Sequence, residues 1–443
     1  MKPCDRVVLT LSLLALISSA GVATAQQPHA REIVKVRALF DLIRTGKYDA
    51  FLSACDARVK EGLPAPKLKE VWEGLTKSLG PYERELSASA KPVGEHLTVD
   101  LICKFKSGPL KARISIDKDG KVAGLLFLPA NELVEYAAPD YVDSSRFREE
   151  EVSVTSGEFQ LPGTLTVPVG DGPFPAVALV HGSGPHDRDE TVFGRKPFKD
   201  IAGGLATLGV AVLRYEKRTY KYGASMDPEA ITIDSEVADD AIAAVRLLIG
   251  HDAIRSDRVF LVGHSLGAGA APYIATKESG IAGVIMLAAP ARPVYELVDD
   301  QIPYLAAIDG TVDDAEQANI DETRAAVDKL RKGTWKPGDM LLGAPAKYWA
   351  SLDKMAPVKY ALKYEKPMLI IHGGRDYQVS KKDFAIWKKE LGGRKNVTLK
   401  KFGKLDHLLT AGKGKSTPAQ YQTPGHVDRR LIERTAKWIH ARG

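Results

Sequence analysis

Two hydrophobic patterns follow each other in the first third of the chain. Apolar residues first recur every three or four positions, which predicts helices. These residues are Ile33, Val36, Phe40 and Ile43 in one segment and Leu68, Val71, Leu75 and Leu79 in the next. Alternating apolar and polar residues then predict strands at 97–105, 110–116 and 122–127, joined by turns that contain glycine. Residues 31–136 are therefore expected to form a small α+β domain.

The pattern changes after a linker at about residues 135–147. Two strands within 151–168 are expected to pair antiparallel. Short continuous apolar runs then alternate with helical segments, ending in a helix near 427–440. The apolar runs are residues 176–180, 259–262 and 368–371. This alternation predicts a mostly parallel sheet with helices on both faces, so that residues 148–443 form one α/β domain.

One long insertion interrupts the parallel series. Residues 291–365 are too many for an ordinary crossover between neighbouring strands. Within the insertion, residues 313–332 have helical spacing, and a later apolar face also suggests a helix. That face consists of Tyr348, Trp349, Leu352 and Met355. We predict that the insertion is a helical lid; the alternative is a surface-packed segment that never meets substrate.

A G-x-S-x-G motif, Gly263-His264-Ser265-Leu266-Gly267, directly follows the apolar run 259–262. Small residues compatible with a helix come next, so Ser265 is placed where a buried strand turns sharply into a helix. Glycine on either side leaves room for such a turn, and a serine exposed there is a nucleophile elbow. The motif alone also occurs by chance, but this context predicts that Ser265 is a catalytic nucleophile.

A serine hydroxyl needs a base and a group that orients the base. Asp376 follows the buried run 368–371, and His407 lies in the loop after a short strand pattern at 396–400. We predict that His407 is the general base and later the general acid, and that Asp376 fixes its tautomer. Asp406 is a rival for the role of Asp376. However, it is the direct neighbour of His407 in the chain, and adjacent side chains rarely reach each other in the geometry of a triad. A solvated carboxylate in a turn is therefore the simpler interpretation of Asp406.

Other histidines are less suitable as the base. His264 belongs to the elbow itself, and His372 ends a strand, where a structural role is expected. His426 and His440 lie in or near the terminal helix. His407 could instead be a loop-capping histidine, which is the alternative to its catalytic role.

Backbone N–H donors are also required to stabilise an oxyanion. Leu266, directly after the nucleophile, is expected to supply one donor. The apolar run 176–180 ends in His181-Gly182-Ser183-Gly184-Pro185, and we predict that Ser183 supplies the second. The alternative is that this glycine-rich loop is only a turn.

These segments together resemble an α/β-hydrolase from about residue 150 onward. The resemblance is to bacterial dienelactone-hydrolase-like and serine-aminopeptidase-like esterases that carry an N-terminal domain of the DUF3887 type. The matching segments are residues 181–190, 213–219, 263–267, 373–379 and 406–408. The resemblance implies the α/β-hydrolase fold with a helical lid insertion, preceded by the small α+β domain. Dienelactone hydrolases proper use a cysteine at the elbow, where this chain has Ser265.

The resemblance also implies a carboxylic ester hydrolase that needs no metal or organic cofactor and acts through an acyl-enzyme on small to medium acyl esters. A serine peptidase with the same triad is the alternative. A carboxylate that anchors a free amine would favour the peptidase, and the acidic residues of the insertion leave that open. They are Asp299, Asp300, Asp313 and Asp314. A non-catalytic binding protein is disfavoured because Ser265, Asp376 and His407 are all present.

Several further residues near these motifs invite a functional role. Asp187, Arg188 and Asp189 follow the glycine-rich loop, and another charged group follows a strand. That group is Arg214, Lys217 and Arg218. Either set could grip a substrate, but ion pairs between the loops are the simpler interpretation. Tyr377 and Gln378, next to the predicted acid, are further candidates for lining the pocket. The N-terminal domain could bind substrate or a surface, although a folding or dimerisation module is favoured.

Composition narrows the remaining possibilities. The chain has 443 residues, 44% hydrophobic and 27% charged, which excludes a disordered protein and a membrane bundle. Its formal net charge is +6 with scattered basic residues, so no nucleic-acid partner is predicted. Lys2 and Arg6, an apolar run and an A-x-A site predict a signal peptide over residues 1–25 and a secreted or periplasmic protein. An uncleaved membrane anchor is the alternative.

The chain has three cysteines, of which Cys4 lies in the predicted signal peptide. Cys55 and Cys103 could form a disulfide in an oxidising compartment or remain two buried thiols. Neither has metal-ligand spacing to another cysteine or histidine, so no metal site is predicted. The oligomeric state is not predicted.

Overall fold

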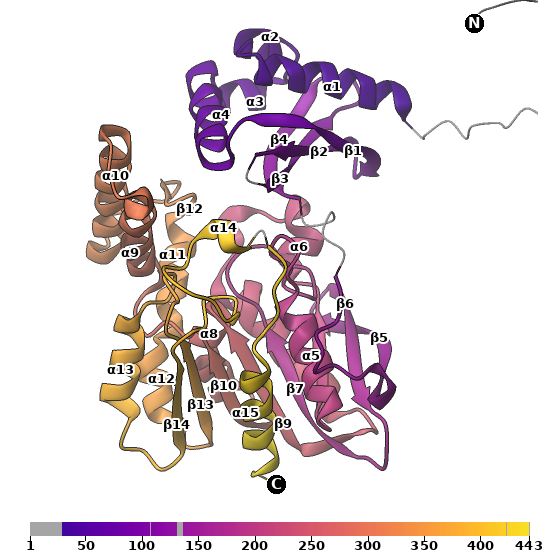
Figure 1. Ribbon diagram of the computed structural model, residues 1–443, viewed down its shortest axis with the longest axis vertical. Coiled ribbons are helices and arrows are strands. Elements are labelled where there is room, and N and C mark those ends of the chain that lie inside the picture. The colour runs from indigo at the N-terminus through magenta and orange to yellow at the C-terminus, as the bar shows by residue number, and fades with distance from the viewer. Residues whose placement is uncertain (1–28, 107, 131–135, 422, 443) are drawn as a thin grey trace, which may run out of the picture. The chain divides into compact units, whose positions relative to one another are not determined.

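The computed structural model describes residues 29–106, 108–130, 136–421 and 423–442. It divides between Leu128 and Pro129 into two compact units (Figure 1). The predicted signal peptide, residues 1–25, lies outside the described residues. Within the described ranges, no helix is both long enough and apolar enough to cross a membrane.

The first unit places four helices before a four-stranded antiparallel sheet in the order β1-β2-β3-β4. The helices are α1 (Ala30–Arg44), α2 (Tyr48–Ser53), α3 (Ala57–Gly62) and α4 (Ala65–Leu79). The strands are β1 (Tyr82–Val93), β2 (His96–Phe105), β3 (Gly108–Ile116) and β4 (Val122–Pro129). Alternate residues of β2, such as Val99 and Leu101, pack with Ile33, Val36 and Phe40 of α1 in one core. The predicted small domain of helices followed by a sheet is confirmed.

The structure of this unit adds a strand that the sequence did not predict and settles the state of the two cysteines. The strand β1 was not predicted: it lies at the edge of the sheet, none of its residues is buried, and so it lacks a regular apolar alternation. Cys55 and Cys103 are both free and buried. Burial raises the pKa of the Cys55 thiol to about 11 and that of Cys103 to about 12.

The second unit is built on an eight-stranded sheet in the order β14-β13-β10-β9-β7-β8-β6-β5. Pairing is parallel from β14 to β8 and antiparallel at β6 and β5. The strands are β5 (Phe147–Ser156), β6 (Phe159–Pro168), β7 (Phe174–Val180), β8 (Ala211–Tyr215), β9 (Ile254–His264), β10 (Ile281–Leu287), β13 (Met368–Gly373) and β14 (Val397–Phe402).

Helices cover both faces of this sheet, as Figure 1 shows. Alternate residues of β7 separate two cores: Val177 and Leu179 pack with α5 and α15, whereas Ala176 and Ala178 pack with α7 and α8. The helices are α5 (Pro197–Thr207), α6 (Arg218–Tyr222), α7 (Asp239–Ile249), α8 (Leu266–Lys277), α13 (Lys381–Leu391), α14 (Pro418–Tyr421) and α15 (Arg429–His440). The predicted α/β-hydrolase architecture is confirmed.

The insertion between β10 and β13 is mainly helical. Its elements are α9 (Val294–Ala306), α10 (Asp314–Lys332), β11 (Met340–Leu341), β12 (Ala344–Pro345), α11 (Ala346–Leu352) and α12 (Pro357–Lys363). A capping box between Asp313 and Glu316 starts α10. Trp349, Leu352 and Met355 are buried in the same core as α8, so the insertion is anchored to the sheet domain.

The predicted linker also contacts this unit. The Tyr136 hydroxyl donates a hydrogen bond of 2.8 Å to Asp200, and the Tyr141 hydroxyl donates one of 2.7 Å to the Val427 carbonyl. Residues 136–141 therefore contribute packing to the hydrolase unit.

The turn from β9 into α8 is the tightest place in the sheet domain. Ser265 has φ 51° and ψ −117°, a backbone conformation that residues other than glycine rarely adopt. A Cβ on Gly263 would overlap the Gly267 backbone, and one on Gly267 would overlap the Val180 carbonyl of β7. Two glycines at this turn are therefore required by the approach of α8 to β9 and β7.

We expect Gly267→Ala to lower the free energy of unfolding by about 3 kcal/mol, because the added methyl group meets backbone atoms that cannot rotate away. Gly393→Ala is the matched control, since nothing lies within 4 Å of an added Cβ there. Urea unfolding of both variants measures the effect. Equal stability of the two would contradict this account of the turn.

Candidate active site

Loops at the carboxyl edge of the parallel strands carry the predicted site residues. Ser265 follows β9, Ser183 follows β7, and Asp376 and His407 follow β13 and β14. Ligands bind at this edge of a parallel sheet because successive strand ends open there together. The fold therefore brings together residues that are far apart in the chain.

Ser265 is held by backbone hydrogen bonds on both sides of its turn. Its N–H donates to the Leu287 carbonyl of β10 at 2.9 Å, and its carbonyl accepts from Gly269 of α8 at 3.0 Å. The residue is half-buried and lines a cavity. The strained backbone thus presents this serine at the cavity wall.

His407 and Asp376 form a buried pair. The Nδ1 atom of His407 lies 2.8 Å from Oδ2 of Asp376. The other carboxylate oxygen of Asp376 accepts the N–H groups of Gln378 at 2.9 Å and Val379 at 3.0 Å, which fix its orientation. A carboxylate at Nδ1 favours the tautomer that carries its proton there and leaves Nε2 as a proton acceptor.

Asp406 faces a different group. It lies 3.5 Å from Arg195 and accepts the Thr410 N–H at 3.0 Å. The side chain is buried, which corrects the expected solvated turn carboxylate: its loop folds inward against Arg195. Burial raises the pKa of this carboxyl group, although the hydrogen bond from Thr410 and the Arg195 charge oppose that effect.

The four other histidines considered as the base have structural partners. His372 stacks on Phe384 with ring centroids 5.1 Å apart, His426 pairs with Asp200, and the His440 ring contacts the Leu208 carbonyl at 2.8 Å. His264 is buried behind the elbow, where its Nε2 lies 2.9 Å from the His407 carbonyl oxygen.

Glu190 is a buried residue whose role the sequence did not indicate. Its carboxylate lies 2.9 Å from Nδ1 of His264 and accepts the Gly182 N–H at 2.6 Å. Burial alone would raise the pKa of the Glu190 carboxyl, but the neighbouring His264 lowers it to about 2. Burial lowers the pKa of His264, but the nearby Glu190 carboxylate has the larger effect, so the His264 pKa is raised. This ion pair joins the loops of Gly182, the elbow and His407.

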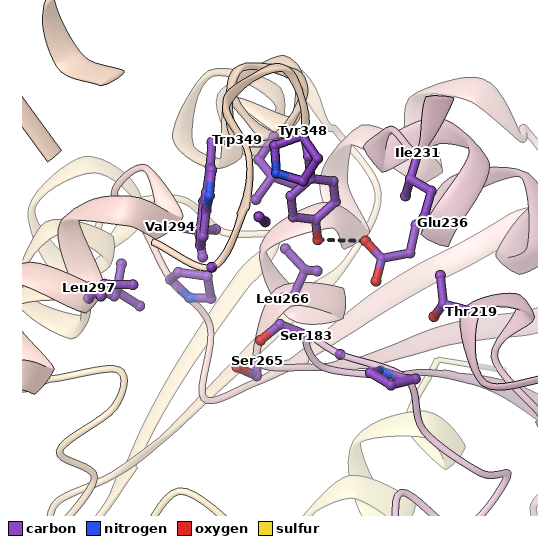
Figure 2. Close-up of a pocket in the computed structure, with 18 of the residues that line it drawn as sticks. Ser183, Thr219, Ile231, Glu236, Ser265, Leu266, Val294, Leu297, Tyr348 and Trp349 are labelled. Carbon is purple, nitrogen blue, oxygen red and sulfur yellow. Dashed lines mark hydrogen bonds between the residues drawn. The ribbon is translucent and has the colours of Figure 1, made fainter. Parts of the chain in front are cut away.

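The glycine-rich loop lies beside the elbow. Gly182 packs so closely on Ser265 that an added Cβ would lie 3.3 Å from the serine Cβ. Ser183 and Leu266 line the same cavity as Ser265, and Figure 2 shows the three close together. Leu266 is the first residue of α8, so its N–H has no acceptor within that helix. Both predicted donor residues therefore border the serine.

Most of the charged residues near these loops form ion pairs, as predicted, whereas Asp187 accepts the N–H and the hydroxyl of Thr191. Arg214 contacts Asp189 and Glu149, Lys217 contacts Glu236 at 2.6 Å, and Arg218 contacts Asp240. Arg188 contacts Glu151 at 2.7 Å. The predicted ion pairing is therefore confirmed for five of the six residues, and Lys217 also donates to two carbonyl groups of the glycine-rich loop.

The cavity above Ser265 has a volume of about 580 Å³ and is mostly apolar. The insertion supplies much of its wall, as Figure 2 shows for the labelled residues Val294, Leu297, Tyr348 and Trp349. Gln378 also lines the cavity, whereas Tyr377 stacks on Tyr304 of α9 with ring centroids 4.9 Å apart.

Three of the four acidic side chains considered as amine anchors are engaged elsewhere. Asp299 lies 3.6 Å from Arg324. Asp300 pairs with Arg292 at 2.8 Å and Lys382 at 2.6 Å, and Asp313 caps α10. The acidic residue in the cavity wall is Glu236, which is paired with Lys217. Among the described residues, no group of three histidine, cysteine or acidic side chains is arranged to hold a metal ion.

Comparisons with known proteins agree with this architecture. Residues 177–408 match the model of the alpha/beta hydrolase family, and residues 36–125 match DUF3887, a protein family of unknown function. Esterase EstD of Thermotoga maritima is 42% identical over 393 residues, which cover 88% of this chain and 91% of EstD.

Two solved esterase structures are also similar. Est1E from Butyrivibrio proteoclasticus has 17% identity and a TM-score of 0.44, covering 66% of this chain and 98% of that chain. An esterase from Pyrobaculum calidifontis has 14% identity and a TM-score of 0.42, covering 66% and 85% respectively. On the match to the family model and the identity to EstD, the chain belongs to the alpha/beta hydrolase family and carries an N-terminal DUF3887 domain.

Proposed function

We propose that the protein is a serine carboxylic-ester hydrolase that acts through an acyl-enzyme on small to medium acyl esters. The observation that carries this proposal is the placement of Ser265 in a strained elbow at the wall of an apolar cavity, with the His407–Asp376 pair at the same edge of the sheet. The similarity to esterase EstD along most of both chains supports the same reaction class.

Each residue of the proposed triad has a distinct role. His407 takes the Ser265 hydroxyl proton as the serine oxygen attacks the ester carbonyl carbon, and it then gives that proton to the departing alcohol. Water, deprotonated by His407, next attacks the acyl carbon. The bond from that carbon to the Ser265 oxygen breaks, His407 returns the proton to this oxygen, and the acid is released. Asp376 holds the imidazole in orientation and stabilises its charged form. The carbonyl oxygen becomes negative in both steps and accepts the N–H groups of Ser183 and Leu266.

The cavity supports the proposed substrate class. Its volume of about 580 Å³ and its walls of Val294, Leu297 and Trp349 suit an acyl chain of modest length. We propose that the insertion acts as a lid, since Trp349 and Leu352 of α11 border the space next to the serine.

An aminopeptidase would need a free carboxylate to anchor the substrate amine. Glu236 lines the cavity, but its carboxylate is paired with Lys217 at 2.6 Å and accepts the Tyr348 hydroxyl at 2.6 Å. Charge balance at this wall therefore favours an uncharged ester over a peptide with a free amine.

We expect the protein to hydrolyse short p-nitrophenyl esters faster than aminoacyl anilides, with a chain-length optimum that reports the size of the cavity. Ser265→Ala should lower kcat by more than about 10⁴-fold, because no other group forms the acyl-enzyme. Steady-state kinetics across both substrate series measures this. Ser279→Ala, at an exposed site, is the control; cleavage of anilides alone would favour the peptidase.

We expect Asp376→Asn to lower kcat by about 10³- to 10⁴-fold, because an amide at this position no longer favours the productive tautomer of His407. Asp406→Asn tests the neighbouring carboxylate, which faces Arg195, and should lose less than about tenfold. Rates per folded molecule compare the two variants. A larger loss of kcat in Asp406→Asn than in Asp376→Asn would show that Asp406, and not Asp376, orients His407.

We propose that the protein is exported. The support is the charged start, apolar run and A-x-A site of residues 1–25. Expression in a bacterial host with secretion should give a processed chain beginning at Gln26, as N-terminal sequencing would show. An intact Met1 on the cell-associated protein would argue for the membrane-anchor alternative.

A further inference from the structure

Lys217 lies directly behind the loop that carries Ser183. Its Nζ donates to the Gly182 carbonyl at 2.8 Å and to the Gly184 carbonyl at 3.0 Å, and it lies 2.6 Å from Glu236. Three acceptors match the three N–H donors of a lysine ammonium group. Only 3% of the Lys217 side chain and 4% of the Glu236 side chain are exposed, so water does not compete for these contacts.

The contact with Gly182 acts on the peptide unit that supplies the Ser183 N–H. The Gly182 carbonyl and the Ser183 N–H belong to the same planar peptide, and in a trans peptide they point in opposite directions. A side chain that fixes the carbonyl oxygen therefore also fixes the direction of the N–H. Lys217 holds the carbonyl side of this peptide, while Ser183 borders the cavity with Ser265 (Figure 2).

The charge of Lys217 also changes the strength of this donor. A cation bound to the carbonyl oxygen withdraws electron density from the peptide and makes its N–H a stronger donor, as hydrogen bonds in a chain polarise one another. Negative charge develops on the ester oxygen only during the reaction, so a donor that is aimed and polarised beforehand lowers the barrier.

Neighbouring contacts keep Lys217 in place. Glu236 belongs to the π-helical turn Asp234–Ala238 before α7, and it accepts the Tyr348 hydroxyl of α11 at 2.6 Å, the dashed bond in Figure 2. On the other side of the loop, Glu190 accepts the Gly182 N–H at 2.6 Å. Buried charges of opposite sign therefore hold both ends of Gly182.

We propose that Lys217 is a positioning residue that orients and polarises the Ser183 N–H toward the carbonyl oxygen of the bound ester. This inference rests on the proposed function, because it assumes that the ester reacts at Ser265. It goes beyond the ion pair with Glu236, which by itself would stabilise the fold without changing the rate of the chemical step.

The test compares Lys217→Met with the double variant Lys217→Met/Glu236→Gln, which leaves no unpaired carboxylate in the interior. Lys221→Met, at an exposed position of α6, the short helix that begins directly after Lys217, is the matched control. Rates are measured with a short p-nitrophenyl ester and expressed per active site titrated with a fluorophosphonate, so that misfolded molecules do not count.

We expect both Lys217 variants to lower kcat by about 10- to 100-fold, less than the loss of a whole oxyanion donor. Their KM should change by less than about threefold, because the uncharged ground-state carbonyl needs the donor little. The inhibition constant of a trifluoromethyl ketone should rise in parallel with the loss of kcat/KM, since its serine adduct carries the same oxyanion. Lys221→Met should match the wild type.

Three outcomes would overturn the inference. If both Lys217 variants keep kcat within threefold of the wild type while Ser265→Ala is inactive, Lys217 is only structural and the esterase proposal stands. If kcat falls but ketone inhibition is unchanged, Lys217 does not act through the oxyanion. If the wild type cleaves no ester, the proposed function fails and takes this inference with it.

Discussion

The close approach of β7, β9 and α8 is the constraint on which the site depends. Gly263 and Gly267 allow it, because a Cβ at either position would overlap backbone atoms. The same contact holds Ser265 at φ 51° and brings Gly182 against it. One packing contact thus brings the nucleophile and the glycine-rich loop together, and Leu266 at the start of α8 lines the same cavity.

Buried charges then fix the loops that this contact brings together. Glu190 joins the Gly182 N–H to His264, and His264 reaches the backbone of His407. Lys217 joins the carbonyls on either side of Ser183 to Glu236 and so to the insertion. Removing one partner of such a pair would leave a buried charge, so each pair resists rearrangement. The loops of the site are therefore held rigidly although they have little regular structure of their own.

Local patterns predicted much of this arrangement. The apolar runs at 176–180, 259–262 and 368–371 became β7, part of β9 and β13, because a buried parallel strand is apolar on both faces. Exposed β1 lacked that signal. The role of Glu190 and the burial of Asp406 could not be predicted, since their partners His264 and Arg195 are distant in the chain and meet only in the folded domain. Lys217 was correctly placed in an ion pair, but its contact with Gly182 required the three-dimensional structure.

The most direct test of the account is a crystal structure of the protein after reaction with an alkyl fluorophosphonate. The account predicts a phosphorus–oxygen bond at Ser265, with the phosphonyl oxygen accepting the N–H groups of Ser183 and Leu266 and the alkyl chain lying in the cavity beside Trp349. Attachment at another residue, or a phosphonyl oxygen directed away from Ser183 and Leu266, would contradict it.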